Sequence, residues 1–178
     1  HGCGAFKKFG YSTADAIFGA SRKEMDRYPF NRGYTNVTVS SPEVIWAYEE
    51  AMNYSHESGV VKALGSSRTD IFYDKDFIAK AYETLYSLMP EAKGKKVILY
   101  APTFRGRVAK AKTPNVLSPE FMKYVLGDEY VLLMKHHPLV RKRPVIQEVC
   151  ADFARDMTDD MTIEDLLCVS DICISDYS

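Results

Sequence analysis

The chain has 178 residues, 46% of them hydrophobic, which is enough material for one globular core. Its 23 Lys and Arg residues nearly balance its 24 Asp and Glu residues, so the net charge of −1 argues against a global attraction to nucleic acid. No apolar run approaches the roughly 18 residues of a membrane span, so any membrane contact is expected to be peripheral.

The first 35 residues are rich in glycine and aromatic residues, and we expect residues 1–35 to form an entry loop and helix packed on the domain that follows. From residue 36 onward, strand and helix patterns alternate. Residues 37–41 form a short β-prone run, and Ser41-Pro42-Glu43 then supplies an N-cap, a proline at the first helical position and an acid. Residues 60–64 are predicted to form a second strand.

A helix is predicted over about 76–88, followed by a continuous apolar strand at 96–101. Ser118-Pro119-Glu120 begins another helix, and a second continuous apolar strand follows at 130–134. A short helix starts near Thr162, and residues 171–174 are predicted to form the final strand. This alternation predicts a doubly wound, mostly parallel α/β sheet over 36–178, which is a Rossmann-like domain. We expect this domain to be truncated at its C-terminus, and the chain to be an internal piece of a larger protein.

Four segments follow predicted strands, where parallel sheets place their ligand-binding loops. They share hydroxyls, histidines and arginines, which suit a phosphate-bearing ligand better than a metal cage or a nucleophilic triad. The segments are 65–70, 101–105, 136–141 and 175–178.

Each candidate also has a purely structural interpretation. Arg105 could pair with a surface carboxylate, and His136 and His137 could be a structural pair beside a turn. Asp176 could cap a following helix. Lys142 and Arg143 are interpreted as solvated surface charges.

The N-terminal segment His1-Gly-Cys-Gly is a further candidate, because its glycines let the backbone approach a ligand closely. Lys7 and Lys8 bring positive charge within a few residues. The alternative is that His1 is the remnant of an expression tag.

Five segments, in order along nearly the whole chain, resemble motifs of the CDP-glycerol glycerophosphotransferase family, the teichoic acid polymerases and primases of Gram-positive bacteria. Ser67 stands where proline is usual in that family, and Ser175 where threonine is common. These departures leave the polyol that is transferred undefined. The five segments are His1-Gly-Cys-Gly-Ala-Phe-Lys-Lys-Phe-Gly10, Leu64-Gly-Ser-Ser-Arg-Thr-Asp70, Val97-Ile-Leu-Tyr-Ala-Pro-Thr-Phe-Arg105, Lys135-His-His-Pro138 and Ser170-Asp-Ile-Cys-Ile-Ser-Asp-Tyr-Ser178.

The resemblance implies a GT-B architecture, with this chain as much of the C-terminal, nucleotide-binding half. The implied reaction moves glycerol phosphate, or a related polyol phosphate such as ribitol phosphate, from a CDP-activated donor to a lipid-linked teichoic-acid-type acceptor and releases CMP. The resemblance also implies that the protein acts at the cytoplasmic face of the cell membrane, as a peripheral membrane protein. We expect this fragment alone to be inactive.

Within that reaction, His1 is the candidate catalytic residue, either as the base or as a group that stabilises the pyrophosphate. A base from outside the chain is equally compatible with the sequence. Arg105 and Arg141 are candidate pyrophosphate clamps, because guanidinium groups bind phosphate oxygens in pairs. The remaining candidate substrate-binding residues, for the donor's phosphates or cytidine, are Thr103, His137, Asp176, Tyr177 and Ser178.

No metal or other cofactor is expected, because the four segments that follow predicted strands lack the Asp-x-Asp of metal-dependent transferases. The four cysteines have no CxxC spacing, which fits a reducing cytosol. Two other functions stay open at this point. One is another GT-B enzyme, such as a UDP-sugar transferase or epimerase, and the other is a non-catalytic nucleotide-binding domain.

Overall fold

The computed structural model of the chain describes residues 8–14, 16–17, 19–106, 110–114 and 116–176. It divides into two compact units, His1–Thr69 and Asp70–Ser178, which are described here one at a time. The predicted boundary after residue 35 is a different division, and the two domains that it defines stay a prediction.

The first unit is built around two short parallel strands, β1 (Val37–Val39) and β2 (Val61–Ala63), with Val37 opposite Val61. The chain between them forms the 3-10 turn η2 (Pro42–Val44), the helix α2 (Ile45–Met52) and the turn η3 (His56–Ser58). Val39, Val44 and Val61 form a small core beneath α2. Trp46, on α2, is 61% exposed.

The turn η1 (Gly10–Thr13) and the helix α1 (Arg22–Arg27) precede these strands, and a capping box between Ser21 and Glu24 begins α1. The buried Tyr11 donates a hydrogen bond of 3.0 Å to the Met25 carbonyl. Gly10 has a φ of +53°, and a Cβ atom there would lie 2.1 Å from the Ala51 carbonyl oxygen. Only glycine therefore allows η1 to approach α2 this closely.

The second unit contains a four-stranded sheet in the order β5-β4-β3-β6, with every neighbouring pair parallel. In the register, Leu99 of β3 lies opposite Leu133 of β4 and Cys173 of β6. The turn η4 (Ser67–Tyr73) crosses the boundary between the units. The elements that follow it are α3 (Lys75–Leu88), η5 (Pro90–Ala92), β3 (Lys96–Tyr100), α4 (Pro119–Leu126), β4 (Tyr130–Met134), η7 (Glu148–Cys150), β5 (Ala154–Asp156), α5 (Ile163–Val169) and β6 (Ile172–Ile174).

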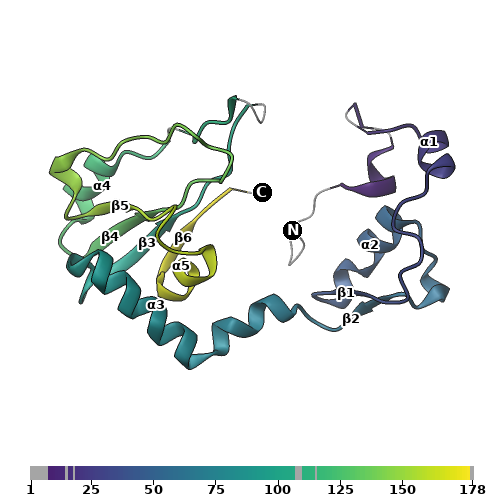
Figure 1. Cartoon of the computed structure of the whole chain (residues 1–178), viewed down its shortest axis with the longest axis horizontal. Helices are drawn as coiled ribbons and strands as arrows, with labels where there is room; N and C mark the ends of the chain where they lie inside the picture. The colour runs from purple at the N-terminus through teal and green to yellow at the C-terminus, as the bar shows by residue number, and fades with distance from the viewer. Residues whose placement is uncertain (1–7, 15, 18, 107–109, 115, 177–178) are drawn as a thin grey trace. The chain divides into compact units, whose positions relative to one another are not determined.

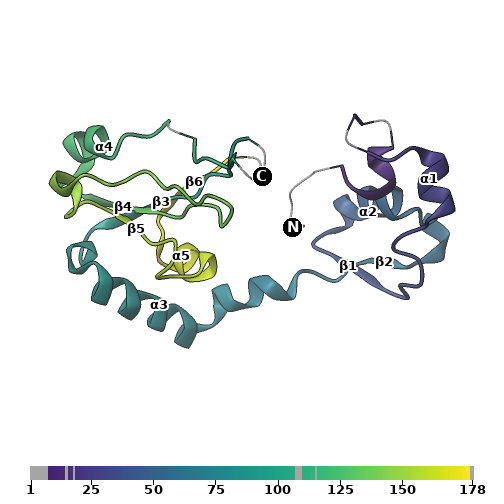
Figure 2. The ribbon, with the colours of Figure 1, turned by 45° about the horizontal axis from the view of Figure 1, so that its top comes forward.

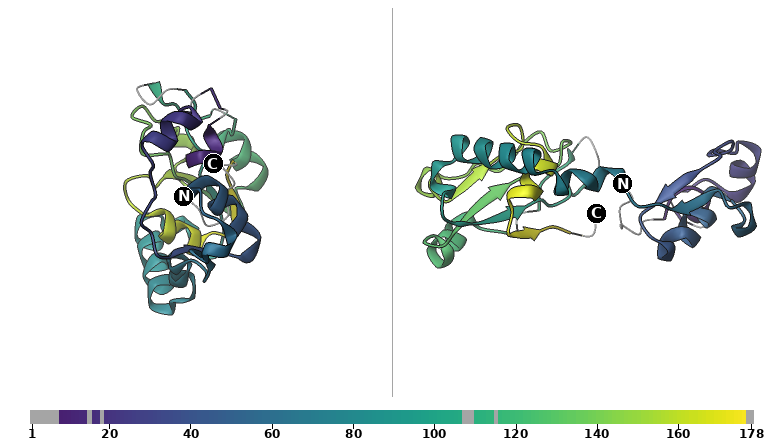
Figure 3. Two further views of the ribbon diagram at one scale, coloured as in Figure 1. Left: turned by 90° about the vertical axis from the view of Figure 1, so that its right-hand side faces the viewer. Right: turned by 90° about the horizontal axis from the view of Figure 1, so that it is seen from below.

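Helices cover both faces of this sheet, so the unit has three layers (Figure 1). On one face, α3 and α5 pack against Val97, Leu99, Val131 and Leu133, and the view from below in Figure 3 shows α3 running along that face. On the other face, α4 packs against a second cluster that includes Leu132, and Figure 2 shows α4 across the sheet from α3. Burial on both faces explains why β3 and β4 are continuously apolar.

The predicted α/β class with parallel strands is therefore confirmed, but two details differ. The strands β1 and β2 form a sheet of their own rather than adding to the four-stranded sheet. The strand β5 was not predicted, because it has only three residues and two of them, Arg155 and Asp156, are charged.

Candidate functional site

The loop after β3 and the end of β6 lie side by side, because parallel neighbouring strands end at the same edge of a sheet. The Ala101 N–H donates to the Ile174 carbonyl at 2.9 Å, and the Ser175 hydroxyl donates to the Ala101 carbonyl at 2.8 Å. These bonds extend the β3–β6 pairing beyond the strands. They fix the positions of the residues that follow each strand.

Thr103, Arg105 and Asp176 meet just beyond these bonds. The Thr103 hydroxyl donates to Asp176 Oδ2 at 2.6 Å and accepts from Arg105 Nη1 at 2.9 Å. Arg105 Nη2 forms an ion pair with the same carboxylate oxygen at 2.8 Å. The Thr103 hydrogen bond, followed by the Arg105 interaction, lowers the pKa of the Asp176 carboxyl below its usual value, so Asp176 is an anion at neutral pH.

Arg105 therefore pairs with a carboxylate, as its purely structural interpretation expected. The partner, Asp176, is itself one of the predicted substrate-binding residues. The Arg105 side chain is nevertheless 56% exposed. Its Nε atom makes no hydrogen bond to any residue that the structure describes. Arg105 thus keeps an accessible N–H edge while Asp176 holds the guanidinium in place.

His137 lies beside this group through an aromatic contact. Its ring centroid is 4.8 Å from that of Phe104, the residue between Thr103 and Arg105. The Leu139 N–H donates to His137 Nδ1 at 3.2 Å, so in the neutral ring Nε2 carries the proton. His137 can therefore offer an N–H to a phosphate oxygen.

Arg141 is exposed and forms no ion pair with any residue in the described part of the chain. The structure connects Thr103, Arg105 and Asp176 directly and His137 through Phe104, but it shows no contact between Arg141 and this group. The predicted site residues His1, Tyr177 and Ser178 lie outside the described residues.

A second polar cluster is centred on His136, which lies in the candidate segment 136–141 but was not among the predicted substrate-binding residues. His136 is only 1% exposed, and its Nδ1 atom lies 2.8 Å from the Thr113 hydroxyl. Its backbone N–H donates to the Thr158 hydroxyl at 2.9 Å. His136 thus links the segment before α4 to the loop after β5, one residue from His137.

The Nε2 atom of His136 is buried without a hydrogen-bond partner among the described residues, and it lies 3.8 Å from Asp156 Oδ2. Burial lowers the pKa of His136; Asp156 raises that pKa and Arg143 lowers it. Arg143 forms ion pairs with Asp156 and Asp159, so its interpretation as a solvated surface charge is wrong. Arg143 competes with His136 for Asp156, which favours a neutral His136.

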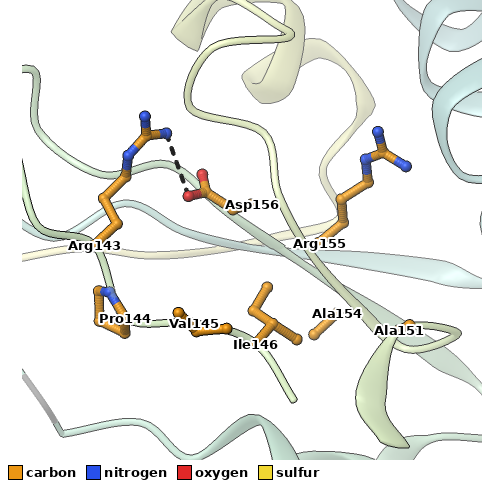
Figure 4. A pocket seen from close by; sticks show the side chains of 8 residues that line it. All are labelled: Arg143, Pro144, Val145, Ile146, Ala151, Ala154, Arg155 and Asp156. Carbon is orange, nitrogen blue, oxygen red and sulfur yellow. Dashed lines mark hydrogen bonds and ion pairs between the residues drawn. The ribbon is translucent and has the colours of Figure 1, made fainter. Parts of the chain in front are cut away.

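An open, shallow pocket of about 430 Å³ lies between the segment 143–146 and β5 (Figure 4). The Arg143–Asp156 ion pair forms part of its wall. The other guanidinium in the wall, Arg155, donates to the Leu88 carbonyl at 2.6 Å and pairs with Asp160. Both arginines thus already interact with groups of the protein itself, which stabilises this wall of the pocket.

Among the described residues, no group of three or more His, Cys, Asp or Glu side chains is placed to hold a metal ion. In the same part of the chain, every helix is too short or too polar to cross a membrane.

The sequence profile of one family, CDP-Glycerol:Poly(glycerophosphate) glycerophosphotransferase, matches residues 1–178. The chain is 37% identical to the teichoic acid ribitol-phosphate primase of Bacillus spizizenii, over 100% of the chain and 45% of that protein. It is 41% identical to the teichoic acid poly(ribitol-phosphate) polymerase of the same organism, over 100% of the chain and 28% of that protein. It is also 30% identical to the teichoic acid glycerol-phosphate primase of Bacillus subtilis, over 100% of the chain and 44% of that protein.

The fold resembles that of the wall teichoic acid polymerase TagF, with a TM-score of 0.70 and 23% identity over 100% of the chain and 44% of TagF. A variant of TagF soaked with CDPG gives a TM-score of 0.69. The chain spans less than half the length of these relatives.

Proposed function

Because the chain belongs to the CDP-glycerol:poly(glycerophosphate) glycerophosphotransferase family, we propose that it forms the donor-binding part of a polyol-phosphate transferase. The proposed donor is CDP-glycerol or a related CDP-polyol. The proposed acceptor is a hydroxyl of a lipid-linked teichoic-acid-type polymer, and the leaving group is CMP.

The observation that carries this proposal is the group formed by Thr103, Arg105 and Asp176 at the carboxyl edge of β3 and β6. Arg105 is held by its carboxylate and still exposes an N–H edge, which suits a pyrophosphate oxygen. His137, whose ring contacts that of Phe104, adds an N–H donor. The group therefore concentrates donors for a phosphate-bearing ligand where parallel sheets bind such ligands.

The proposed reaction is attack of the acceptor oxygen on the outer phosphorus of the donor. The bond between that phosphorus and the bridging oxygen breaks, the acceptor proton passes to a base, and CMP leaves with the bonding pair. Positioning and neutralisation of the developing negative charge supply most of the rate enhancement in phosphoryl transfer. We assign Arg105, Arg141 and His137 to that electrostatic role, together with Thr103 as a positioning group.

The roles proposed for His1, Tyr177 and Ser178 rest on the motifs alone. We propose that His1 either accepts the acceptor proton or stabilises the pyrophosphate. Tyr177 and Ser178, which follow Asp176 directly, would contact the donor's phosphates or cytidine.

Ribitol phosphate is as strong a candidate as glycerol phosphate. The relatives named above at 37% and 41% identity are ribitol-phosphate enzymes by name, whereas the one at 30% is a glycerol-phosphate primase. CDP-ribitol and CDP-glycerol should therefore be tested side by side. We further propose that the enzyme works at the cytoplasmic face of the membrane as a peripheral protein, since its acceptor is attached to lipid.

The decisive test is calorimetric titration of the chain with CDP-glycerol, CDP-ribitol, CMP and UDP-glucose. We expect heat with one CDP-polyol and with CMP, and a much smaller response to UDP-glucose. Arg105→Ala should weaken the binding, while the exposed control Lys142→Ala should not. Absence of heat with both CDP-polyols, or preference for UDP-glucose, would overturn the proposal.

Turnover is a separate measurement. CMP release with a lipid-linked acceptor should be followed for the chain alone and for the chain joined to the complementary half of a family member. We expect release only from the joined protein.

A further inference from the structure

A short antiparallel pairing stands next to the Thr103–Asp176 group. The Arg105 N–H donates to the Lys112 carbonyl at 2.8 Å, and the Lys112 N–H donates back to the Arg105 carbonyl at 3.0 Å. Gly106 begins the connection between them with a φ of +92°, and a Cβ atom there would lie 3.1 Å from the Lys110 carbonyl oxygen. The backbone at Gly106 therefore lies close to Lys110, as that of Arg105 lies against Lys112.

This pairing puts like charges opposite each other. Residues that exchange both backbone bonds project their side chains on the same side, and like charges in that position destabilise the pair. Asp176 neutralises Arg105. Lys112 has no ion pair with any residue that the structure describes, so its charge stays uncompensated within the described chain.

Lys110 adds a second charge that has no ion pair among the described residues. Ala111 is buried, whereas Lys110 and Lys112 on either side of it are exposed. The side chains of Lys110 and Lys112 are therefore both open to solvent and to a ligand. The sequence supplies no acid between Glu91 and Glu120 to balance them.

We propose that Lys110 and Lys112 bind the phosphodiester backbone of the acceptor polymer and hold its growing end beside Arg105. This inference rests on the proposed function, in which the acceptor is a chain of polyol phosphates. Such a chain carries one negative charge in each repeat, and two neighbouring exposed cations match a repeating anion. Their continuity with Arg105 places the polymer next to the site proposed for the donor's phosphates.

The same two lysines could instead contact an anionic membrane. The continuity with Arg105 favours the polymer, because a polymer end must reach the donor for transfer to occur. The experiment below separates the two ligands.

The test uses a fluorescent, soluble poly(glycerol phosphate) oligomer and measures its anisotropy with the chain at increasing NaCl concentrations. The double variant Lys110→Gln/Lys112→Gln is compared with Lys75→Gln/Lys80→Gln, a matched pair of exposed lysines on α3. We expect the first variant to bind the oligomer about tenfold more weakly and the second to bind it like the wild type. Binding should weaken as salt screens the charges.

Two further arms keep the outcomes apart. Calorimetry with the CDP-polyol should give the same affinity for Lys110→Gln/Lys112→Gln as for the wild type. If the wild type does not bind the CDP-polyol at all, that result counts against the proposed function and not against the lysine site. Vesicles of phosphatidylcholine with phosphatidylglycerol form the second arm. Equal oligomer binding by both double variants, or a defect confined to the vesicles, would overturn the inference.

Discussion

The Thr103 hydroxyl donates a hydrogen bond of 2.6 Å to Asp176 Oδ2, and this bond joins the loop after β3 to the end of β6 across 73 residues of sequence. The same hydroxyl accepts from Arg105. Thr103 thus determines where both the anion and the cation of the site are held.

Thr103→Val should weaken CDP-polyol binding severalfold, because it leaves Arg105 and Asp176 in place but removes the hydroxyl between them. The loss of stability should be about 1 kcal/mol, the usual net value of one hydrogen bond. Calorimetry and urea unfolding measure the two effects. Thr84→Val is the matched control, since the Thr84 hydroxyl donates to the Lys80 carbonyl within α3; an equal loss of donor affinity in both variants would contradict the role of Thr103.

In the chain joined to the complementary half of a family member, Arg141→Ala should lower turnover at least about tenfold, or roughly 1.4 kcal/mol of barrier, if Arg141 clamps the pyrophosphate. Its stability should match the wild type, because Arg141 is exposed and forms no ion pair with the described residues. CMP release and thermal unfolding give the two readouts. The neighbouring Lys142→Ala is the control, and an Arg141→Ala enzyme with the wild-type rate would exclude the assignment.

Asp176→Asn should destabilise the chain at neutral pH by an amount that disappears in acid. The pKa of Asp176 is lowered in the folded state, so the stabilisation by its carboxylate is complete above the unfolded value of about 3.9. It is lost as the pH falls through the lower, folded pKa. Urea unfolding at a series of pH values from 7 downward should show the curves of wild type and variant converging, and a gap that persists in acid would refute the ionic role.

His136→Asn should flatten the pH dependence of stability in mildly acidic solution. Burial lowers the pKa of His136, so the unfolded chain takes up this proton first as the pH falls below about 6.5. The wild type therefore loses stability between neutral pH and the lowered pKa, and the variant lacks that contribution. The rest of the chain is the same in both proteins, so the difference between the two urea-unfolding profiles isolates His136; parallel profiles would show that His136 does not titrate differently on folding.

The sequence was a good guide to the centre of the sheet and a poor guide to its edge. Continuous apolar runs predicted β3 and β4, and Ser118 with Pro119 predicted the start of α4, where the Ser118 hydroxyl accepts from the Phe121 N–H. The edge strand β5 has no such run. Its charged residues are held by partners far along the chain, such as the Leu88 carbonyl, which local patterns cannot reveal.

The candidate site, too, was predictable from the sequence only in part. The rule that ligands bind at strand ends selected Thr103, Arg105 and Asp176, but their mutual pairing depends on the register of β3 and β6. His136 was judged together with His137, although successive residues after a strand point to opposite sides. That alternation, applied to a histidine pair directly after a buried strand, was the signal that one of the two would be buried.

The position of Trp46 affects how all of these unfolding experiments should be read. It is the only tryptophan in the sequence and lies on α2, in the first unit, with 61% of its surface exposed. Fluorescence excited selectively at tryptophan therefore reports on the first unit, whereas far-ultraviolet circular dichroism is dominated by the longer helices and the sheet of the second. Coincident curves from the two probes would show that the units unfold as one cooperative block, and separated curves would give each unit its own free energy of unfolding.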